Sequence, residues 1–186
     1  NRQQQGRDGV WLDLPTTTEQ VQAALRQIDI SSDNPQDLFI SGYFAEEEKR
    51  FAIPYNMVLA SNVDELNFLA SRLETLSTGE RAELNAALQA PQSELFSIGR
   101  ITDFPENVDY YVHLPDVRGP AQLGDYYLNR SGMVDMPDEW KGGINTAQFG
   151  RYVAQQEQGA FTQYGYLVKS GDVWQKVHEG QPVPEE

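Results

Sequence analysis

The sequence predicts an α+β fold in which two mixed α/β regions flank a central helical region. Between residues 61 and 100, apolar residues recur at the spacing of an amphipathic helix. On both sides of this stretch, short runs rich in aromatic and β-branched residues end at Pro, Gly or Asn, as strands do. The chain has 186 residues and is 39% apolar, which is enough to bury a core. The length suits one large domain or two to three small ones, and the three regions cover residues 1–60, 61–100 and 101–186.

The first region is predicted to combine strands with one helix. The run 10–14 is typical of a strand and stops at a proline. Threonines at 16–18 are suitable caps for a helix whose apolar positions recur as far as Ile28. A second strand is expected over 38–44, followed by a charged hairpin tip. A return strand over 51–59 contains a proline, which restricts it to a sheet edge.

The central region carries two helix-capping signals. Ser61 or Asn62 precedes an acidic residue by three positions, and Ser77 precedes Glu80 by the same spacing. An apolar stripe follows each cap. The first stripe consists of Val63, Leu66, Leu69, Ala70, Leu73 and Leu76. We therefore predict an αα-hairpin of two short helices. Each is near or below the ~12–15 residues at which an isolated helix becomes marginal, so the pair must pack on the rest of the chain.

The third region returns to a mixture of strands and helices. The run 108–114 predicts a strand that ends at a proline. A helix is expected over 120–129, with a proline in its first turn, and a second helix from the cap Asn145 to a glycine stop. Two final strands, 161–169 and 173–177, are predicted on either side of a Ser-Gly-Asp turn.

The excess of carboxylates is the strongest functional signal. The chain has 28 Asp and Glu against 14 Lys and Arg, a net charge of −14. Residues 8–65 hold eleven acidic and three basic residues, and residues 101–139 hold eight and two. Such a charge repels nucleic acid and anionic membranes and attracts basic surfaces, including the clefts in which proteins hold DNA. The charge therefore favours a partner with a basic surface, and neither nucleic acid nor a membrane.

Several other classes of protein lack their sequence signals. The chain has no Cys, no apolar run near the ~18–20 residues that span a bilayer, and no signal-peptide pattern, which favours a cytoplasmic location. The nucleophile elbow, the phosphate loop and the dinucleotide fingerprint are missing. The two histidines, His113 and His178, lie far apart and are interpreted as structural. We expect no catalytic residue, metal or cofactor. The alternative is a metal-dependent hydrolase that uses clustered carboxylates.

Several segments, taken in order, resemble the ArdA antirestriction proteins of bacterial mobile elements. Residues 9–15 show the family's Gly-x-Trp…Pro pattern ahead of a helix. Residues 64–76 resemble its Glu-Leu-Asn helix, and 80–88 resemble the helix that follows. Near the C-terminus, the similar stretches include 125–128 and the aromatic-Gly-Arg triplet at 149–151. The resemblance covers nearly the whole chain and depends on this series rather than on one motif.

The resemblance implies an elongated, non-enzymatic protein of three small domains, 1–60, 61–100 and 101–186. It also implies that the protein imitates bent B-form DNA and occupies the DNA-binding site of Type I restriction-modification enzymes. It also implies a homodimer joined through the C-terminal domain, where Phe149, Tyr152 and Val153 are candidate contacts; the alternative is that these three belong to the core. An alternative target is another DNA-binding defence or regulatory complex. The candidate DNA-mimic carboxylates are Asp29, Asp33, Asp37, Glu46, Glu47, Glu48, Asp103, Glu106, Asp109 and Asp116.

Overall fold

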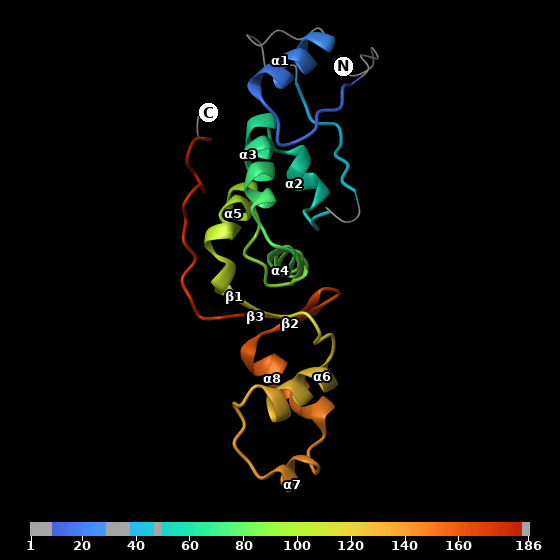
Figure 1. Cartoon of the computed structure of the whole chain (residues 1–186), viewed down its shortest axis with the longest axis vertical. Coiled ribbons are helices and arrows are strands. Elements are labelled where there is room, and N and C mark those ends of the chain that lie inside the picture. Colours follow the sequence, from blue (N-terminus) through green and yellow to red (C-terminus); the bar gives the residue numbers. More distant parts are fainter. Residues whose placement is uncertain (1–8, 29–37, 47–49, 184–186) are drawn as a thin grey trace.

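The structure, a computed structural model, describes residues 9–28, 38–46 and 50–183. The molecule is elongated, with helix α1 at one end, helix α7 at the other and a small sheet between them (Figure 1). Within the described residues, helices and an antiparallel three-stranded sheet occur together, which confirms the α+β class.

The elements follow one another in the order α1–α5, β1, α6–α8, β2 and β3. The helices before the sheet are α1 (Thr18–Gln27), α2 (Tyr55–Leu59), α3 (Val63–Glu74), α4 (Thr78–Gln89) and α5 (Ile98–Thr102). Two short 3-10 turns, η3 (Phe104–Glu106) and η4 (Val108–Tyr110), lead into β1 (Tyr111–Leu114). Then come α6 (Pro120–Asp125), the π-helical turn η5 (Tyr126–Arg130), α7 (Asp138–Lys141), α8 (Thr146–Glu157), β2 (Ala160–Thr162) and β3 (Gly165–Lys169).

The predicted helix caps are confirmed at the starts of α1, α3 and α4. The side chain of Asn62 accepts the N–H of Glu65 at 2.8 Å, and the Glu65 carboxylate accepts the N–H of Asn62 at 3.4 Å. Ser77 and Glu80 form the same reciprocal pair at the start of α4. Thr17, within the predicted cap region, begins α1. Each pair satisfies backbone donors that a helix leaves unpaired at its first turn.

The three strands predicted in the first region are wrong. Residues 10–14 and 38–44 form no ladder with any described segment. Within the predicted return strand 51–59, the chain turns into α2 directly after Pro54. A proline fits the start of a helix, where its missing N–H would have had no helical partner.

Tyrosine side chains join these extended segments in place of strand pairing. The Tyr43 hydroxyl donates to the Ile53 carbonyl at 3.1 Å, and the Tyr55 hydroxyl donates to the Ser41 carbonyl at 3.1 Å. The two rings stack with centroids 5.6 Å apart. Backbone carbonyls that a neighbouring strand would have satisfied thus receive hydroxyl donors. The aromatic residues that predicted a sheet thus make these hydrogen bonds and this stacking contact instead.

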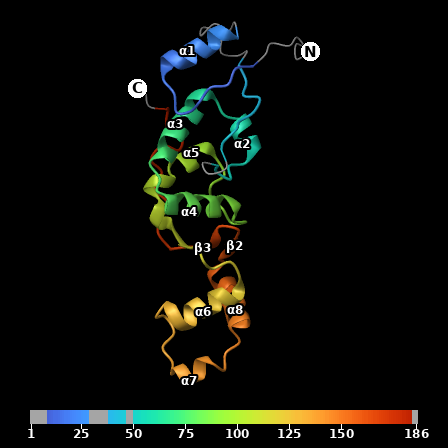
Figure 2. The same ribbon diagram turned by 45° about the vertical axis from the view of Figure 1, so that its right-hand side comes forward.

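Helices α3 and α4 do not form the predicted antiparallel hairpin. Helix α4 runs across the direction of α3 in both views (Figures 1 and 2), while α3 packs on α5. The Arg81 guanidinium donates to the carbonyls of Leu73 and Leu76, at 3.0 and 3.1 Å, and so satisfies acceptors at the end of α3. Leu76 itself is buried in the connection, and its burial draws the corner into the core.

The sheet has the strand order β1-β3-β2, and both pairs are antiparallel. The predicted strand 108–114 forms only from Tyr111 onward. The predicted strand 161–169 is instead a hairpin, because the backbone at Gly165 has a φ of +128° and a Cβ there would lie 2.4 Å from the Leu114 carbonyl oxygen. The strand predicted over 173–177 is wrong, since this segment makes no ladder.

Helices α6 and α8 cross at two glycines. A Cβ on Gly124 would lie 2.0 Å from the Thr146 carbonyl oxygen, and a Cβ on Gly150 would lie 1.8 Å from the Pro120 carbonyl oxygen. Only glycine allows two backbones to approach so closely. Helix α8 begins at the predicted cap Asn145, whose side chain accepts the Gln148 N–H at 2.9 Å. The predicted helix over 120–129 is confirmed as α6 continued by the π turn.

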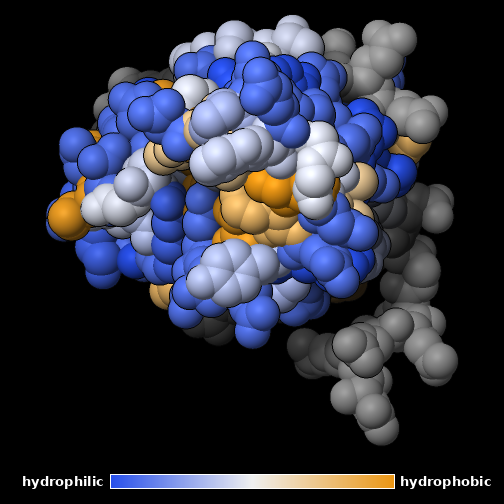
Figure 3. Space-filling view, turned by 90° about the horizontal axis from the view of Figure 1, so that it is seen from below, coloured by the Kyte–Doolittle hydropathy of each residue, from blue (hydrophilic) through white to orange (hydrophobic). Residues whose placement is uncertain are grey.

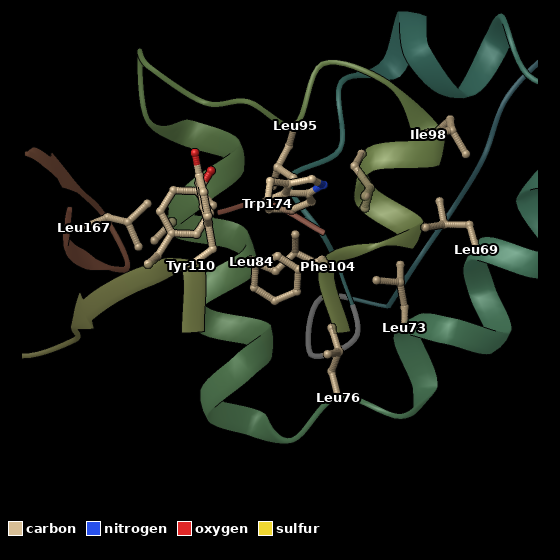
Figure 4. Close-up of a cluster of buried hydrophobic side chains, with 14 of the residues drawn as sticks. Leu69, Leu73, Leu76, Leu84, Leu95, Ile98, Phe104, Tyr110, Leu167 and Trp174 are labelled. Carbon is tan, nitrogen blue, oxygen red and sulfur yellow. The ribbon is translucent and has the colours of Figure 1, made fainter. Parts of the chain in front are cut away.

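Two buried clusters lie on opposite faces of the sheet. The larger cluster contains α3, α4 and α5 side chains, and Leu167 of β3 points into it (Figure 4). The smaller cluster consists of Val117, Leu123 and the neighbouring Tyr166, with partly buried residues around them. Alternate residues of a strand face opposite ways, so β3 serves both clusters. Leu73 and Phe104 share the larger cluster across the predicted 100/101 boundary, and the division into three domains stays a prediction.

Candidate functional site

The structure places half of the predicted DNA-mimic carboxylates. Asp29, Asp33, Asp37, Glu47 and Glu48 lie outside the described residues. Glu46, Glu106, Asp109 and Asp116 are exposed. Asp109 lies in η4 and Asp116 follows β1, so these two flank the same strand. Glu106 forms an ion pair with Arg72 of α3, which neutralises part of its charge.

Asp103 is not a surface carboxylate. Its side chain is fully buried at 0% exposure. Its two oxygens accept three successive backbone N–H groups, those of Val177, His178 and Glu179, at 3.3, 2.6 and 3.2 Å. A buried carboxylate is tolerated when it is fully hydrogen-bonded. The sequence does not distinguish Asp103 from the other acids, because its hydrogen-bond donors come from a segment more than seventy residues away.

Asp109 belongs to an acidic group that the sequence reasoning missed. Glu80 and Glu83 lie three positions apart on α4 and hence on one face, which was the available signal. One carboxylate oxygen of Glu83 is buried without a hydrogen-bond partner among the described residues. Its burial, followed by repulsion from Glu80 and then Asp109, raises the pKa of Glu83 to about 8. These three acids are called the α4 acidic group.

Other carboxylates are held in the ionised form. Hydrogen bonds from Ser77 lower the pKa of Glu80, and hydrogen bonds at the start of α1, first from its own backbone and then from Thr17, lower the pKa of Glu19. Acids in the first turn of a helix are favoured by the unpaired N–H groups there. The capping residues of the fold therefore also supply permanent negative charge at its surface.

Many of the described basic residues pair with carboxylates of the same chain. The ion pairs are Arg72–Glu106, Arg100–Glu94, Arg100–Glu179, Arg130–Asp125, Lys141–Asp138, Lys169–Glu94 and Lys176–Glu179. Exposed pairs of this kind contribute little to stability. Their electrostatic effect is to cancel cations locally, so that the field around the remaining acids is negative.

Both histidines have structural contacts. The His113 ring lies with Nε2 2.8 Å from the Tyr164 carbonyl oxygen, and the His178 ring packs edge-on against Phe68. Within residues 9–28, 38–46 and 50–183, no group of three or more His, Asp or Glu side chains is arranged to hold a metal ion. The same residues include no helix long and apolar enough to cross a membrane.

The end of the molecule beyond the sheet carries a hollow of mixed polarity and, separately, exposed apolar side chains. Seen from below, an apolar patch lies within a hydrophilic rim (Figure 3). A cavity of about 610 Å³ at this end is lined by Leu128, Asn129, Asp138, Lys141, Gly142, Ile144 and Thr146. Met133 and Trp140, on the segment between η5 and α8, are 75% and 67% exposed. Apolar surface of this kind is frequent at sites of protein association.

The predicted dimer contacts differ in their surroundings. Tyr152 is 61% exposed on α8, whereas Val153 packs against the smaller cluster and Phe149 is half-buried. Behind them, the Glu157 carboxylate accepts the Tyr127 hydroxyl at 2.5 Å and the Tyr166 hydroxyl at 3.0 Å. Burial and this carboxylate raise the pKa of both tyrosines. The two hydroxyls therefore stay protonated, and the Tyr127–Glu157–Tyr166 triad holds α8 to η5 and β3.

The sequence model of the antirestriction protein family ArdA matches residues 6–168. This chain belongs to the ArdA family. Among curated proteins, none matches it. Membership implies an antirestriction function, and the ArdA family is not a catalytic one. The matched range of this ArdA protein ends within β3 and contains the α4 acidic group and the α6–α8 crossing. It does not extend to the segment that Asp103 holds.

Proposed function

We propose that this ArdA protein is a DNA mimic that occupies the DNA-binding site of a Type I restriction-modification enzyme and inhibits it. The supporting observation is family membership in a chain of net charge −14. Duplex DNA is held mainly by Lys and Arg contacts to phosphate, and a rigid series of carboxylates offers the same contacts. The activity requires surface geometry and no reactive group, so the protein acts without catalysis and without a cofactor.

The magnitude of the charge suits a short duplex per chain. Duplex DNA carries one charge per ~1.7 Å of axis, so fourteen charges correspond to about 24 Å of duplex. Within the α4 acidic group, Glu80 and Asp109 supply the negative charge, because the pKa of Glu83 is raised to about 8 and its side chain is largely protonated near neutral pH. A symmetric homodimer would double the track and could match a target with two DNA-recognition lobes.

Exposed apolar side chains support dimerisation at the end beyond the sheet. Association through this end would cover Met133 and Trp140, which are otherwise exposed to water. In a two-fold arrangement, the carboxylates of both chains would extend away from the contact on either side. Tyr152 is the predicted contact residue with the greatest exposure and is therefore the one to substitute in a test of the dimer.

Direct binding to a purified Type I enzyme tests the proposal. The protein should displace duplex DNA from the enzyme in an anisotropy assay and should inhibit both methylation and cleavage, which share that DNA site. The dissociation constant of the protein–enzyme complex should rise with salt, as expected for charge contacts. Displacement with a dissociation constant that does not change with salt would contradict charge imitation.

A matched pair of variants locates the charge contacts. Asp109→Asn removes a charge from the α4 acidic group, whereas Asp172→Asn removes one beyond the family match. The slope of log Kd against log salt should fall by up to about one unit for Asp109→Asn. It should not change for Asp172→Asn. Binding to a different DNA-binding complex, with no effect on a Type I enzyme, would support the alternative target.

A further inference from the structure

We infer that residues 170–179, called the C-terminal strap, are a lock that keeps the elongated body rigid. The strap runs from β3 along one side of the molecule, past α5 toward α3 (Figures 1 and 2). It lies beyond the family match, which ends at residue 168. Its effect on inhibition rests on the proposed function, whereas its attachment to the body is a separate physical claim.

The first attachment point is the Asp103 carboxylate. Three successive strap N–H groups, of Val177, His178 and Glu179, converge on its two oxygens. Successive backbone N–H groups in such a turn form a concave anion site, here filled by a side chain of the same chain. Because Asp103 is wholly shielded from water, release of the strap would leave a buried charge without donors.

The second attachment point is Asn107, four residues later. Its side-chain oxygen accepts the Gln175 N–H at 2.7 Å, and its side-chain nitrogen donates to the Gln175 carbonyl at 2.9 Å. The amide thus pairs with the strap as a neighbouring strand would. The adjacent Trp174 is buried in the larger cluster, with its ring edge-on to Tyr110 at 5.1 Å.

The third attachment point is Arg100, a buried cation of α5. Its guanidinium lies 4.8 Å from the Phe96 ring centre and 5.4 Å from that of Trp174. It also pairs with Glu94 at 3.0 Å and with the strap residue Glu179 at 3.3 Å. The strap and residues 94–96 thus each contribute one carboxylate and one aromatic ring to the surroundings of Arg100. A partly buried cation in such a setting contributes more than an exposed ion pair.

The three points give the strap its mechanical effect. Asp103, Asn107 and Arg100 lie in a single segment next to the larger cluster, while the strap begins at β3, which serves both clusters. The strap therefore closes a loop between the sheet and α5. A decoy must present its charges in a fixed geometry, because a flexible one loses affinity to the entropy of ordering. The strap supplies that order.

Hydrogen exchange on the unmodified protein is the first test. The amides of Val177, His178 and Glu179 should exchange as slowly as those of α5, although they lie outside any helix or strand. Exchange of these amides at the rate of an unstructured chain would overturn the proposal. This measurement requires no variant and no restriction enzyme.

A pair of variants with the same charge change gives the second test. Asp103→Asn replaces one of the two acceptor oxygens with an NH2 donor that opposes the strap N–H groups, whereas Asp172→Asn removes an exposed carboxylate of the strap. Asp103→Asn should accelerate exchange over 174–179 by about 100-fold and weaken inhibition by about tenfold. Asp172→Asn should change neither. Equal loss of inhibition in both variants would overturn the proposal.

A covalent tether gives a rescue experiment. A Cβ on Gly99 would lie 3.7 Å from the Glu179 Cβ, close to the mean separation in disulfides. The chain has no cysteine of its own, so Gly99→Cys with Glu179→Cys creates a single pair. Added to Asp103→Asn, the oxidised tether should restore slow exchange and full inhibition, and reduction should reverse both.

The outcomes separate the strap from the proposed function. Restored exchange protection without restored inhibition would show that the strap does not govern activity, and the functional part of the inference would be wrong. No inhibition by the unmodified protein would refute the proposed function, while the exchange data would still decide whether the strap is a lock. If the variant that combines Asp103→Asn with the two cysteines does not fold when reduced, its oxidised form and the unmodified protein still allow hydrogen exchange and inhibition to be measured.

Discussion

The two buried clusters are built by different means. The larger cluster combines many leucines from α3 and α4 with Phe104 and Trp174, and polar groups of the strap close it. The smaller cluster has few buried residues and depends on two helices that touch at Gly124 and Gly150. Its polar support is the Tyr127–Glu157–Tyr166 triad. The larger cluster distributes its stability over many contacts, whereas the smaller one concentrates it in a few.

This difference teaches where each region is vulnerable. When one contact in a broad apolar cluster is lost, neighbouring side chains can move to fill the space. The loss in the free energy of unfolding then depends on how far they do so. A backbone crossing at glycine has no such freedom, because the carbonyl oxygen opposite cannot move without the helix. We therefore expect small changes at the α6–α8 crossing to have larger effects than equal changes elsewhere.

Substitution of Gly150 should give the largest effect. A Cβ there would overlap the Pro120 carbonyl oxygen at 1.8 Å, so Gly150→Ala should reduce the free energy of unfolding by about 3 kcal/mol. Hydrogen exchange should rise over α6 and α8 and remain unchanged over α3 to α5. A uniform rise would show instead that the sheet couples the two clusters. Gly79→Ala is the control, because a Cβ at that helical glycine meets nothing within 4 Å.

Substitution of Glu157 should have the next effect. Glu157→Gln keeps the size of the side chain but leaves one acceptor oxygen for two tyrosine hydroxyls, so one hydroxyl loses its partner. The expected loss is about 1–3 kcal/mol in the free energy of unfolding, measured by urea denaturation. Added Tyr127→Phe removes the unpaired hydroxyl and should recover part of this loss. No recovery would contradict the shared-acceptor arrangement.

Substitution of Glu83, on α4 beside the larger cluster, should change how stability depends on pH. The folded pKa of about 8 lies above the ordinary 4.5, so the native protein keeps a proton that the unfolded chain releases between those values. Stability therefore falls as pH rises from 4.5 to 8. From the lower to the higher pH, Glu83→Gln should gain about 1–2 kcal/mol relative to the unmodified protein, after solvent screening. Parallel stability curves would contradict this.

Removal of a helix cap should have the smallest effect on stability, and one cap near each cluster allows the two clusters to be compared directly. Asn62 caps α3 in the larger region and Asn145 caps α8 in the smaller one. Either change to Ala should lower the free energy of unfolding by about 1 kcal/mol. Asn62→Ala removes only the side-chain acceptor of the Glu65 N–H, because the Glu65 carboxylate accepts the backbone N–H of residue 62, which the substitution keeps. Thermal denaturation of the two variants should show similar shifts, and a much larger shift for one would mean that its cap supports more than its helix.

Local signals predicted the helices well and the strands poorly. Capping residues at Asn62, Ser77 and Asn145 act on N–H groups two or three positions away, so their spacing in the sequence is their geometry. Residues 10–14 and 38–44 have strand composition but no partner strand among the residues that the structure describes, and no local pattern reveals whether a partner exists. Likewise, α3 and α4 were predicted correctly as helices, and their crossing was not.

The candidate carboxylates divide in the same way. Composition alone gave the acidic excess, and the exposure of Asp109 and Asp116 agrees with a surface role that stays a prediction. Asp103 has the same chemistry in the sequence as these two but faces inward, where its acceptors are used by the strap. The pairing of Arg72 with Glu106 likewise joins residues far apart in the chain.

By itself, the sequence determined the net charge, the family and the starts of the main helices, since each depends on residue identity or on spacing within a few positions. Only the tertiary structure decided which carboxylates are exposed, how the two clusters share β3 and where the strap binds. These features depend on contacts between distant segments. Their energy comes from the burial of apolar surface and from hydrogen bonds that no local pattern specifies.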